Sequence, residues 1–344
     1  MPPLPQPRGP LSDHLFTELT SAGGPLSGPD DVSVDDPLRD DDLHLALYAC
    51  YELAYRGFDG VAEEWESAPA LVAFRGVLEA VFADALAEAV GPLPDPPPPD
   101  EMDLALRAIA DADDAPSLSR FVEREADLDQ VKEFVIHRSA YQLKESDPHA
   151  WALPRLSGKP KAALVEILYD EYGGGDAARV HAQLFADTMD ALGLDSSYGA
   201  YLDRIPGVTL ATVNLMSLLG MHRRFRGAIC GHLALFEMTS SVPNHRYADG
   251  LRRLGMGERA TAFFDEHVVA DAVHENIAAV DLAGGLAHAE PAVANDILWG
   301  ARALNLVEGN WARHLTSAWN RGETSLLNSV ARAPVSGARA TEFG

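Results

Sequence analysis

Apolar residues recur at every third or fourth position along most of the chain between residues 43 and 318. That spacing places them on one face of a helix. It predicts helices over residues 43–58, 71–90, 117–143, 160–172, 177–192, 208–219, 226–240, 258–282 and 292–318. Glycine and proline separate these segments, and alternating β-branched runs and hairpin dipeptides are nearly absent. We therefore expect an all-α fold, a bundle of seven or more core helices.

Two acidic segments interrupt this pattern. Residues 1–45 contain nine acidic and two basic residues among prolines and glycines, and residues 92–130 contain eleven acidic and three basic residues. Such compositions bury few apolar groups, and the prolines at 92–103 break any helix. We expect a disordered tail over 1–40 and a single helical domain over 41–330, with a proline-rich surface loop at 92–103. A flexible tail is expected over 331–344.

The charge balance narrows the possible partners. The 344 residues include 52 Asp and Glu against 27 Lys and Arg, a formal net charge of −25. Nucleic acids and anionic membrane surfaces both require a basic protein surface, so we expect neither as a partner. No apolar run reaches the roughly 18–20 residues of a spanning helix, and the first residues do not resemble a secretion signal. The two cysteines cannot form a disulfide framework. We expect a cytoplasmic protein.

The strongest chemical signal is the segment EHVVADAVHE at 266–275. On a helix, His267, Asp271 and His274 fall on one narrow stripe. The stripe continues into the apolar residues Phe263 and Ala278, so it faces the core. Two imidazoles and a carboxylate in such a place suit a non-haem iron or zinc site, because buried polar groups are costly unless paired or bound to metal. The alternative is a helix end with hydrogen-bonded histidines.

Three further residues of ligand type face inward. Glu237 follows Cys230, Leu233 and Ala234 on an apolar face, where a lone glutamate is more often a hydrogen-bonded structural acid. Glu171 ends one predicted helix and His181 lies on the next. The glycines between them would let the two side chains meet, although Glu171 could simply terminate its helix.

Other candidate residues are weaker. Glu133 and His137 have the spacing of a chelating pair, but charged neighbours favour a solvated ion-pair face, and Glu145 lies on a mixed face together with Arg138 and Gln142. His149 follows a proline and is expected off the helix. Cys50 and Cys230 are expected in the core, with a nucleophilic role left open. The basic run 222–226 is expected to make surface or interface ion pairs, with an anionic substrate or a reductase as alternatives. No phosphate-binding or nucleophile-elbow motif is present.

Taken together, these residues resemble the haem-oxygenase-like diiron oxidases, often described as the iron-containing redox enzyme family. The family's His-x3-Asp-x2-His signature matches His267, Asp271 and His274, and its bridging-type glutamate matches Glu237. The complete order is most similar to the N-oxygenase branch, which includes the diiron domain of streptozotocin biosynthesis and amine-to-nitro oxygenases. The resemblance implies a seven-residue metal site of Glu145, Glu171, His181, Glu237, His267, Asp271 and His274.

The resemblance also implies a function. We expect two Fe ions, O2 as co-substrate, an external electron donor and a small amine that is converted to a hydroxylamine, nitroso or nitro compound in specialised-metabolite biosynthesis. Glu171 is the extra carboxylate of the N-oxygenase branch and receives a catalytic role, because it could stay on the metal or move aside for O2. The charge of this ligand set agrees with two Fe(II) ions, because four carboxylates balance their charge and the three imidazoles are neutral.

Several alternatives stay open at this stage. The same metal site could carry out desaturation or oxidative C–C cleavage of an amino or fatty acid. A non-enzymatic all-α ligand-binding or scaffold protein would use the inward acids and histidines structurally. A thiaminase-like hydrolase would need Cys50 or Cys230 as its nucleophile. The substrate, the reductant, the bridging carboxylate and the oligomeric state, a homodimer included, are not determined by the sequence.

Overall fold

The computed structural model describes residues 1–21, 26, 32 and 34–328. This part of the chain contains helices and no strand, so the expected all-α fold is confirmed for it. The α-helices are α1 (Pro10–Thr20), α2 (Asp41–Glu52), α3 (Pro69–Val90), α4 (Met102–Asp111), α5 (Leu118–Arg124), α6 (Leu128–Gln142), α7 (Asp147–Ala150), α8 (Gly158–Glu171), α9 (His181–Ala191), α10 (Gly207–Met221), α11 (Arg226–Arg253), α12 (Glu258–Asn276), α13 (Gly285–Ala289) and α14 (Ala294–Asn320). The flexible tail expected over 331–344 lies outside the described residues.

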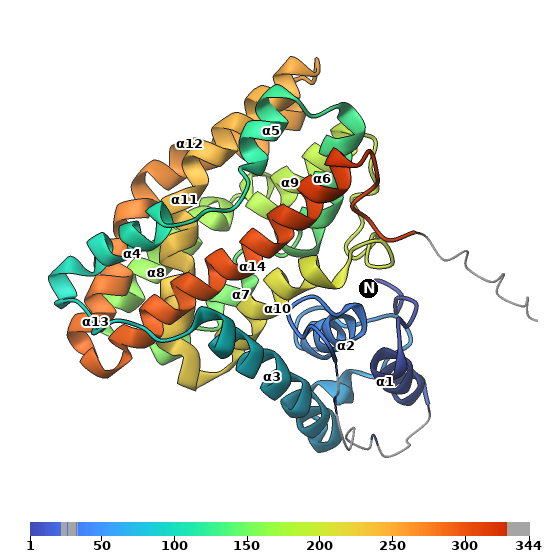
Figure 1. Cartoon of the computed structure of the whole chain (residues 1–344), viewed down its shortest axis with the longest axis horizontal. Helices are drawn as coiled ribbons and strands as arrows, with labels where there is room; N and C mark the ends of the chain where they lie inside the picture. The colour runs from blue at the N-terminus through green and yellow to red at the C-terminus, as the bar shows by residue number, and fades with distance from the viewer. Residues whose placement is uncertain (22–25, 27–31, 33, 329–344) are drawn as a thin grey trace, which may run out of the picture.

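Helix α11 is the centre of the bundle (Figure 1). It packs against α14, α12 and α5, while α9 lies against α12 and α10 lies between α2 and α14. The N-terminal helices α1, α2 and α3 form one end of the molecule (Figure 1). Helix α12, which carries His267 and His274, therefore packs directly against α11, which carries Glu237, in the interior.

The contact between α11 and α14 depends on two glycines. A Cβ atom at Gly231 would overlap the carbonyl oxygen of Ile297, and a Cβ atom at Gly300 would overlap that of Ala228. The two backbones thus approach more closely than any side chain would permit. This crossing holds the N-terminal half of α11, which includes Glu237, close against α14.

Residues 10–20 form helix α1, so the disordered tail expected over residues 1–40 is wrong for this helix, while residues 22–25, 27–31 and 33 of that expected tail lie outside the described residues. Three apolar side chains of α1 are buried, and the helix packs against α2. Asp40 accepts hydrogen bonds from the first N–H groups of α2, and Asp42 accepts them from Leu11 and Ser12 at the start of α1. Carboxylates that cap helices are indistinguishable by composition from solvated ones, which explains the error.

The second acidic segment also contains helices that composition did not predict. Residues 91–98 form no regular secondary structure, but α4 follows and buries Met102 and Leu106. The helix expected over 117–143 is divided into α5 and α6. Asp127 and Gln130 form a reciprocal capping box that starts α6 and thereby separates the two.

Two helices differ from expectation near the predicted site. Helix α11 continues to Arg253 although it contains Pro243, where the predicted helix had already ended. A proline inside a helix costs about 3 kcal/mol, and the contacts that α5 and α12 make with α11 offset this cost. The helix expected over 258–282 changes at Ile277 into a π-helical segment, Ile277–Gly284.

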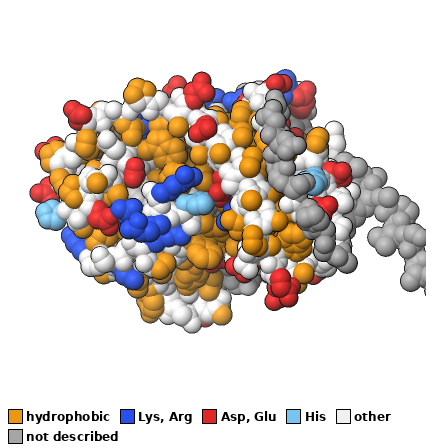
Figure 2. All heavy atoms as spheres, turned by 90° about the horizontal axis from the view of Figure 1, so that it is seen from below, with side chains coloured by type: hydrophobic (Ala, Val, Ile, Leu, Met, Phe, Trp, Pro, Cys, Tyr) orange, Lys and Arg blue, Asp and Glu red, His pale blue; other side chains and the backbone are white. Residues whose placement is uncertain are grey.

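The molecular surface mixes charges despite the large net charge. Figure 2 shows one face on which basic side chains gather in a patch among acidic and hydrophobic ones. In the basic run, Arg226 pairs with Glu290 and His222 with Glu79, as expected for surface ion pairs. Among the described residues, no helix is long and apolar enough to cross a membrane.

Candidate metal centre

The structure brings together six of the seven residues predicted to bind metal. They are Glu145 in the turn after α6, Glu171 at the end of α8, His181 at the start of α9, Glu237 within α11, and His267 and His274 on α12. Each is at most 6% exposed. Asp271 lies on α12 between the two histidines, and its side chain is outside the described part of the structure. Three buried carboxylates in one place are costly unless protons or a bound cation compensate their charge.

Four of these residues form a first group of metal-ligand atoms. One ligand atom from each of Glu145, Glu171, His181 and His267 lies within 4.8 Å of all the others. Nδ1 of His181 is 3.1 Å from Oε2 of Glu171, and Nε2 of His267 is 3.5 Å from Oε1 of Glu145. An ion that holds each ligand at about 2.0–2.2 Å fits between atoms spaced in this way.

A second group shares one member with the first. It consists of Glu171, Glu237 and His274, whose ligand atoms also lie within 4.8 Å of one another. Nδ1 of His274 is 3.5 Å from Oε2 of Glu237 and 3.9 Å from Oε1 of Glu171. Glu171 thus presents one oxygen to each group, and the two groups are adjacent.

Hydrogen bonds orient two of the histidine rings. Nδ1 of His267 is 2.8 Å from the carbonyl oxygen of Phe263, to which it donates, and this leaves the lone pair on Nε2 facing Glu145. Nε2 of His274 lies 3.0 Å from Oδ2 of Asp170 and directs Nδ1 toward the carboxylates. Metal-binding histidines are commonly held by a carbonyl or carboxylate in this way. Asp170 had no signal in the sequence beyond its position next to Glu171.

The electrostatics of the site also favour a bound cation. Burial raises the pKa of Glu145. Burial would raise the pKa of Glu171 as well, but His181, His267 and His274 outweigh it and lower that pKa to about 2. Burial opposes protonation of His274, yet the neighbouring carboxylates raise its pKa to about 9. Without metal, these side chains therefore share protons among themselves.

Oε2 of Glu145 is fully buried and has no hydrogen-bond partner. The buried Nδ1 atoms of His181 and His274 face carboxylate oxygens at 3.1 and 3.5 Å. An unpartnered buried polar atom costs about 1–3 kcal/mol. The oxygen and nitrogen donor set is one that iron accepts, so the residues present fit the expected metal.

A buried ion pair fixes the turn that presents Glu145. Nζ of Lys144 lies 2.8 Å from Oε2 of Glu52, and the two side chains are 1% and 0% exposed. Ser146, one residue beyond Glu145, has the left-handed conformation at φ 68°, the only such non-glycine residue in the described chain. Its hydroxyl donates to Oε2 of Glu171 at 3.0 Å. Strained residues of this kind concentrate at functional sites.

The expected solvated face around Glu133 and His137 is wrong. His137 is buried and hydrogen-bonds to the hydroxyls of Thr209 and Ser325. Glu133 accepts hydrogen bonds from Trp319 and Ser325. Both residues are structural links between α6, α10 and the C-terminal segment. The helical pattern alone could not show that α14 and residue 325 cover this face.

Two other histidines and the cysteines are buried outside the ligand groups. His149 lies off α6, as expected, and belongs to the short helix α7, where it is 3.2 Å from His232. Cys50 and Cys230 lie in the core, as expected, and burial raises both thiol pKa values to about 12. A thiol that stays protonated is a poor nucleophile, which removes the basis for the hydrolase alternative.

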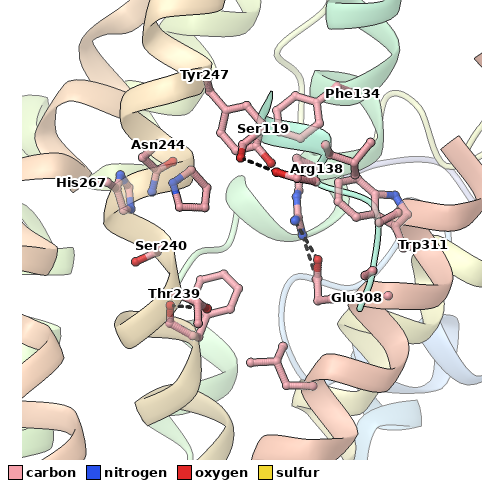
Figure 3. A pocket seen from close by; sticks show the side chains of 18 of the residues that line it. Ser119, Phe134, Arg138, Thr239, Ser240, Asn244, Tyr247, His267, Glu308 and Trp311 are labelled. Atoms are coloured by element: carbon pink, nitrogen blue, oxygen red, sulfur yellow. Dashed lines mark hydrogen bonds and ion pairs between the residues drawn. The ribbon is translucent and has the colours of Figure 1, made fainter. Parts of the chain in front are cut away.

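A cavity of about 380 Å³ opens onto the first ligand group. Its wall includes Glu145 and His267 and continues along α6 past Gln142 to Arg138. Figure 3 shows Arg138 paired with Glu308 of α14, with Phe134, Tyr247 and Trp311 around the pair. A smaller cavity of about 10 Å³ lies between the ligand groups and shares Glu145 and His267. The larger cavity is thus the space from which a substrate can reach the site.

Comparisons with known proteins agree with this geometry. A family model described as an iron-containing redox enzyme matches residues 132–309, a range that includes all seven predicted ligands. A stretch of 137 residues is 28% identical to nitrosourea synthase from Streptomyces achromogenes subsp. streptozoticus. That match covers 40% of this chain and 29% of the relative, so the chain spans less than a third of the protein to which it is similar.

Proposed function

The chain belongs to the iron-containing redox enzyme family, and we propose that it is an O2-dependent oxygenase that uses two iron ions to oxidise an amine nitrogen of a small metabolite. The coarser conclusion, an iron-containing oxidoreductase, follows from the family. The dinuclear site and the reaction are the proposal. The observation that carries it is the position of Glu171, which belongs to both ligand groups. A carboxylate shared by two groups of ligands suits a pair of adjacent ions.

The ligand sets divide between the two ions as follows. Glu145, His181 and His267 would hold one ion, Glu237 and His274 would hold the other, and Glu171 would bridge them. Asp271 completes the second set in the assignment made from the sequence. With Asp271 included, four carboxylates balance the charge of two Fe(II) ions, so the occupied site is neutral and its burial is inexpensive.

The iron, when bound, would supply the electrons and open coordination positions that O2 activation requires. The chain's own residues orient the ligands and keep water away. Leu233 and Phe236 line the smaller cavity beside the ligand groups. Ser146 holds one oxygen of Glu171 through its hydroxyl, so a change in the position of Glu171 would first break this hydrogen bond.

Oxidation at nitrogen is supported by the similarity to nitrosourea synthase, whose name denotes a product with an N-nitroso group. The first oxidation of an amine would consume one O2, two electrons and two protons, forming an N–O bond and one water. The electrons would come from an external donor, because the sequence contains no nucleotide-binding motif. Repetition would give the nitroso and nitro levels.

Mass spectrometry of products made under ¹⁸O2 tests this proposal. Iron-loaded protein, a chemical reductant and a panel of small amines should yield products heavier by one or more ¹⁸O atoms bound to nitrogen. Products that lose two hydrogens or a carbon fragment, with no gain of oxygen, would support desaturation or C–C cleavage and contradict the proposal. Absence of O2 consumption above the iron-free control, with every amine, would also contradict it.

A further inference from the structure

The start of α11 differs in charge from the rest of the molecule. Residues 204–236 contain four arginines and no acidic residue, in a chain whose formal net charge is −25. Two of these arginines, Arg223 and Arg224, are exposed, and neither forms an ion pair with a described residue. An exposed charge without a partner on a surface of the opposite sign is free to pair with another molecule.

Neighbouring side chains extend this feature into a patch. Arg155 donates to the carbonyl oxygens of Gly220 and Met221, directly before the basic run, and Arg75 shares the carboxylate of Glu79 with His222. The basic patch, which lies on the face seen in Figure 2, consists of Arg75, Arg155, His222, Arg223, Arg224 and Arg226. Among the described residues, its electrostatic partners are Glu79, Glu290 and Asp296. Five guanidinium groups therefore exceed three carboxylates.

The patch suits a small acidic protein. Such a protein is repelled by most of this chain's surface, so a local positive charge determines where it docks. The N-terminal end of α11 adds the positive end of a helix dipole. Phe225 lies between Arg224 and Trp299, and arginine and aromatic residues are enriched at protein interfaces. A nucleic acid or a membrane would extend beyond the patch and meet the acidic surface around it.

Helix α11 connects the patch to the ligand groups. Arg226 begins the helix and Glu237 follows eleven residues later, which corresponds to about 16 Å along the axis. Between them, the buried ring of His232 stacks on Phe236, with ring centres 6.1 Å apart. Phe236 lines the small cavity together with Glu237. Electrons tunnel through protein over distances of this order, so a carrier docked on the patch can reach the site.

We infer that the basic patch docks a small acidic electron-transfer protein, which supplies electrons to the ligand groups. This inference rests on the proposed function, in which the first oxidation of an amine consumes two electrons for each O2. At each docking, a one-electron carrier is oxidised by one electron and one Fe(III) ion is reduced to Fe(II). The carrier must therefore dock twice for each O2.

A plant-type [2Fe–2S] ferredoxin is a suitable probe, because it is small, acidic and transfers one electron. In calorimetric titrations, its affinity for the full-length protein should fall by about ten-fold or more between low salt and roughly 0.2 M NaCl. R223E/R224E should bind it at least about ten-fold more weakly than the wild type. R120E/R124E makes the same change of charge at two exposed positions on α5 and should bind it as the wild type does. No binding by the wild type, or equal losses in the two variants, would overturn the inference.

Two further measurements separate charge complementarity from loss of the fold. Binding of cytochrome c, a basic carrier, should not weaken in R223E/R224E, and a parallel loss of both carriers would contradict a docking site based on charge. The milder variant R223Q/R224Q should bind ferredoxin about three-fold more weakly or less tightly still. Unchanged binding in that variant would contradict the assignment. Self-association that R223E/R224E abolishes, without ferredoxin binding, would assign the patch to a second copy of this chain and overturn the inference.

Reduction kinetics distinguish this inference from the proposed function. Reduced ferredoxin should reduce Fe(III)-loaded wild type about ten-fold faster than R223E/R224E, while dithionite should reduce both at equal rates. Ferredoxin binding is also measured on iron-free protein. Binding and reduction that depend on the patch, without oxidation of any amine, contradict only the proposed function. Amine oxidation with a chemical reductant, together with ferredoxin binding that does not depend on the patch, contradicts only the docking site.

Discussion

Oε2 of Glu171 lies 3.1 Å from Nδ1 of His181, although α8 ends at the first residue and α9 begins at the second. The turn between them depends on Gly173, whose φ is +70°. A Cβ atom at Gly173 would overlap the backbone of Arg179 and Val180. The contact between these two predicted ligands is therefore a consequence of this glycine.

Replacing Gly173 should disturb the first ligand group. In Gly173→Ala, the new Cβ atom would overlap the backbone, and alanine would also have to adopt a left-handed conformation that it disfavours. The substitution should therefore weaken the binding of one iron by about ten-fold or more. Gly175→Ala is the matched control, because Gly175 also has a positive φ but no atom within 4 Å of its Cβ position. Calorimetric iron titrations should show a clear loss only for Gly173→Ala. Equal effects of both changes would mean that the turn does not position His181.

The buried pair of Lys144 and Glu52 should support both stability and metal binding. Lys144→Met leaves Glu52 without its cation and should lower the free energy of unfolding by about 3–5 kcal/mol. The double change Lys144→Met with Glu52→Leu should recover much of this loss. Urea unfolding of the metal-free proteins measures both values. A single variant as stable as the wild type would show that the pair does not hold the turn before Glu145.

The crossing of α11 and α14 should tolerate no side chain at its glycines. Gly231→Ala should lower the free energy of unfolding by about 1–3 kcal/mol or more, because the two helix backbones must separate. Gly76 in α3 provides the control, since its Cβ position is open. Gly76→Ala should stabilise the protein by about 0.5–1 kcal/mol through helix propensity. The prediction fails if both substitutions change the denaturation midpoint in the same direction.

Buried neutral histidines should make the metal-free fold sensitive to acid. Burial lowers the pKa of His44 to about 4, against 6.5 for the free side chain. The unfolded chain thus binds a proton near pH 6.5 that the folded protein binds only near pH 4. The free energy of unfolding should fall by up to about 3 kcal/mol per such histidine as the pH decreases through this window.

Urea unfolding between pH 7.5 and pH 4.5 tests this dependence. His44→Gln should reduce the slope of unfolding free energy against pH, whereas His245→Gln, at an exposed position, should leave it unchanged. His149, whose pKa burial also lowers to about 4, should contribute in the same direction. Identical slopes for the wild type and His44→Gln would contradict the assignment of the effect to His44.

Periodicity within single helices predicted the helical fold and the inward-facing side chains of Glu237, His267 and His274, which are buried. Glu145 lies on a mixed face, and only the family resemblance assigned it to the site. His267 and His274 share a face of α12 whatever surrounds them. The predictions of secondary structure were wrong where the conformation of a segment depends on its contacts with another helix. Asp40 and Asp42 looked like parts of a solvated tail, yet they cap helices. Pro243 looked like a helix end, yet packing on both sides carries α11 past it.

The sequence predicted only part of the cavity wall. Arg138, Gln142 and Glu145 could be aligned along one face of a predicted helix, but the face appeared mixed and ambiguous. Glu308 lies 170 residues from Arg138 in the chain, and no local pattern joins them. The membership of Glu171 in both ligand groups likewise became apparent only when α8, α11 and α12 were placed together.

Iron stoichiometry tests the central claim most directly. Anaerobic titration of metal-free protein with Fe(II), followed by metal analysis after removal of unbound ions, should give two irons per chain for the wild type. Glu171→Ala should bind fewer than two, while Glu166→Gln, at an exposed position on the same helix, should still bind two. One iron or none in the wild type, or two in Glu171→Ala with unchanged affinity, would contradict a dinuclear site bridged by Glu171.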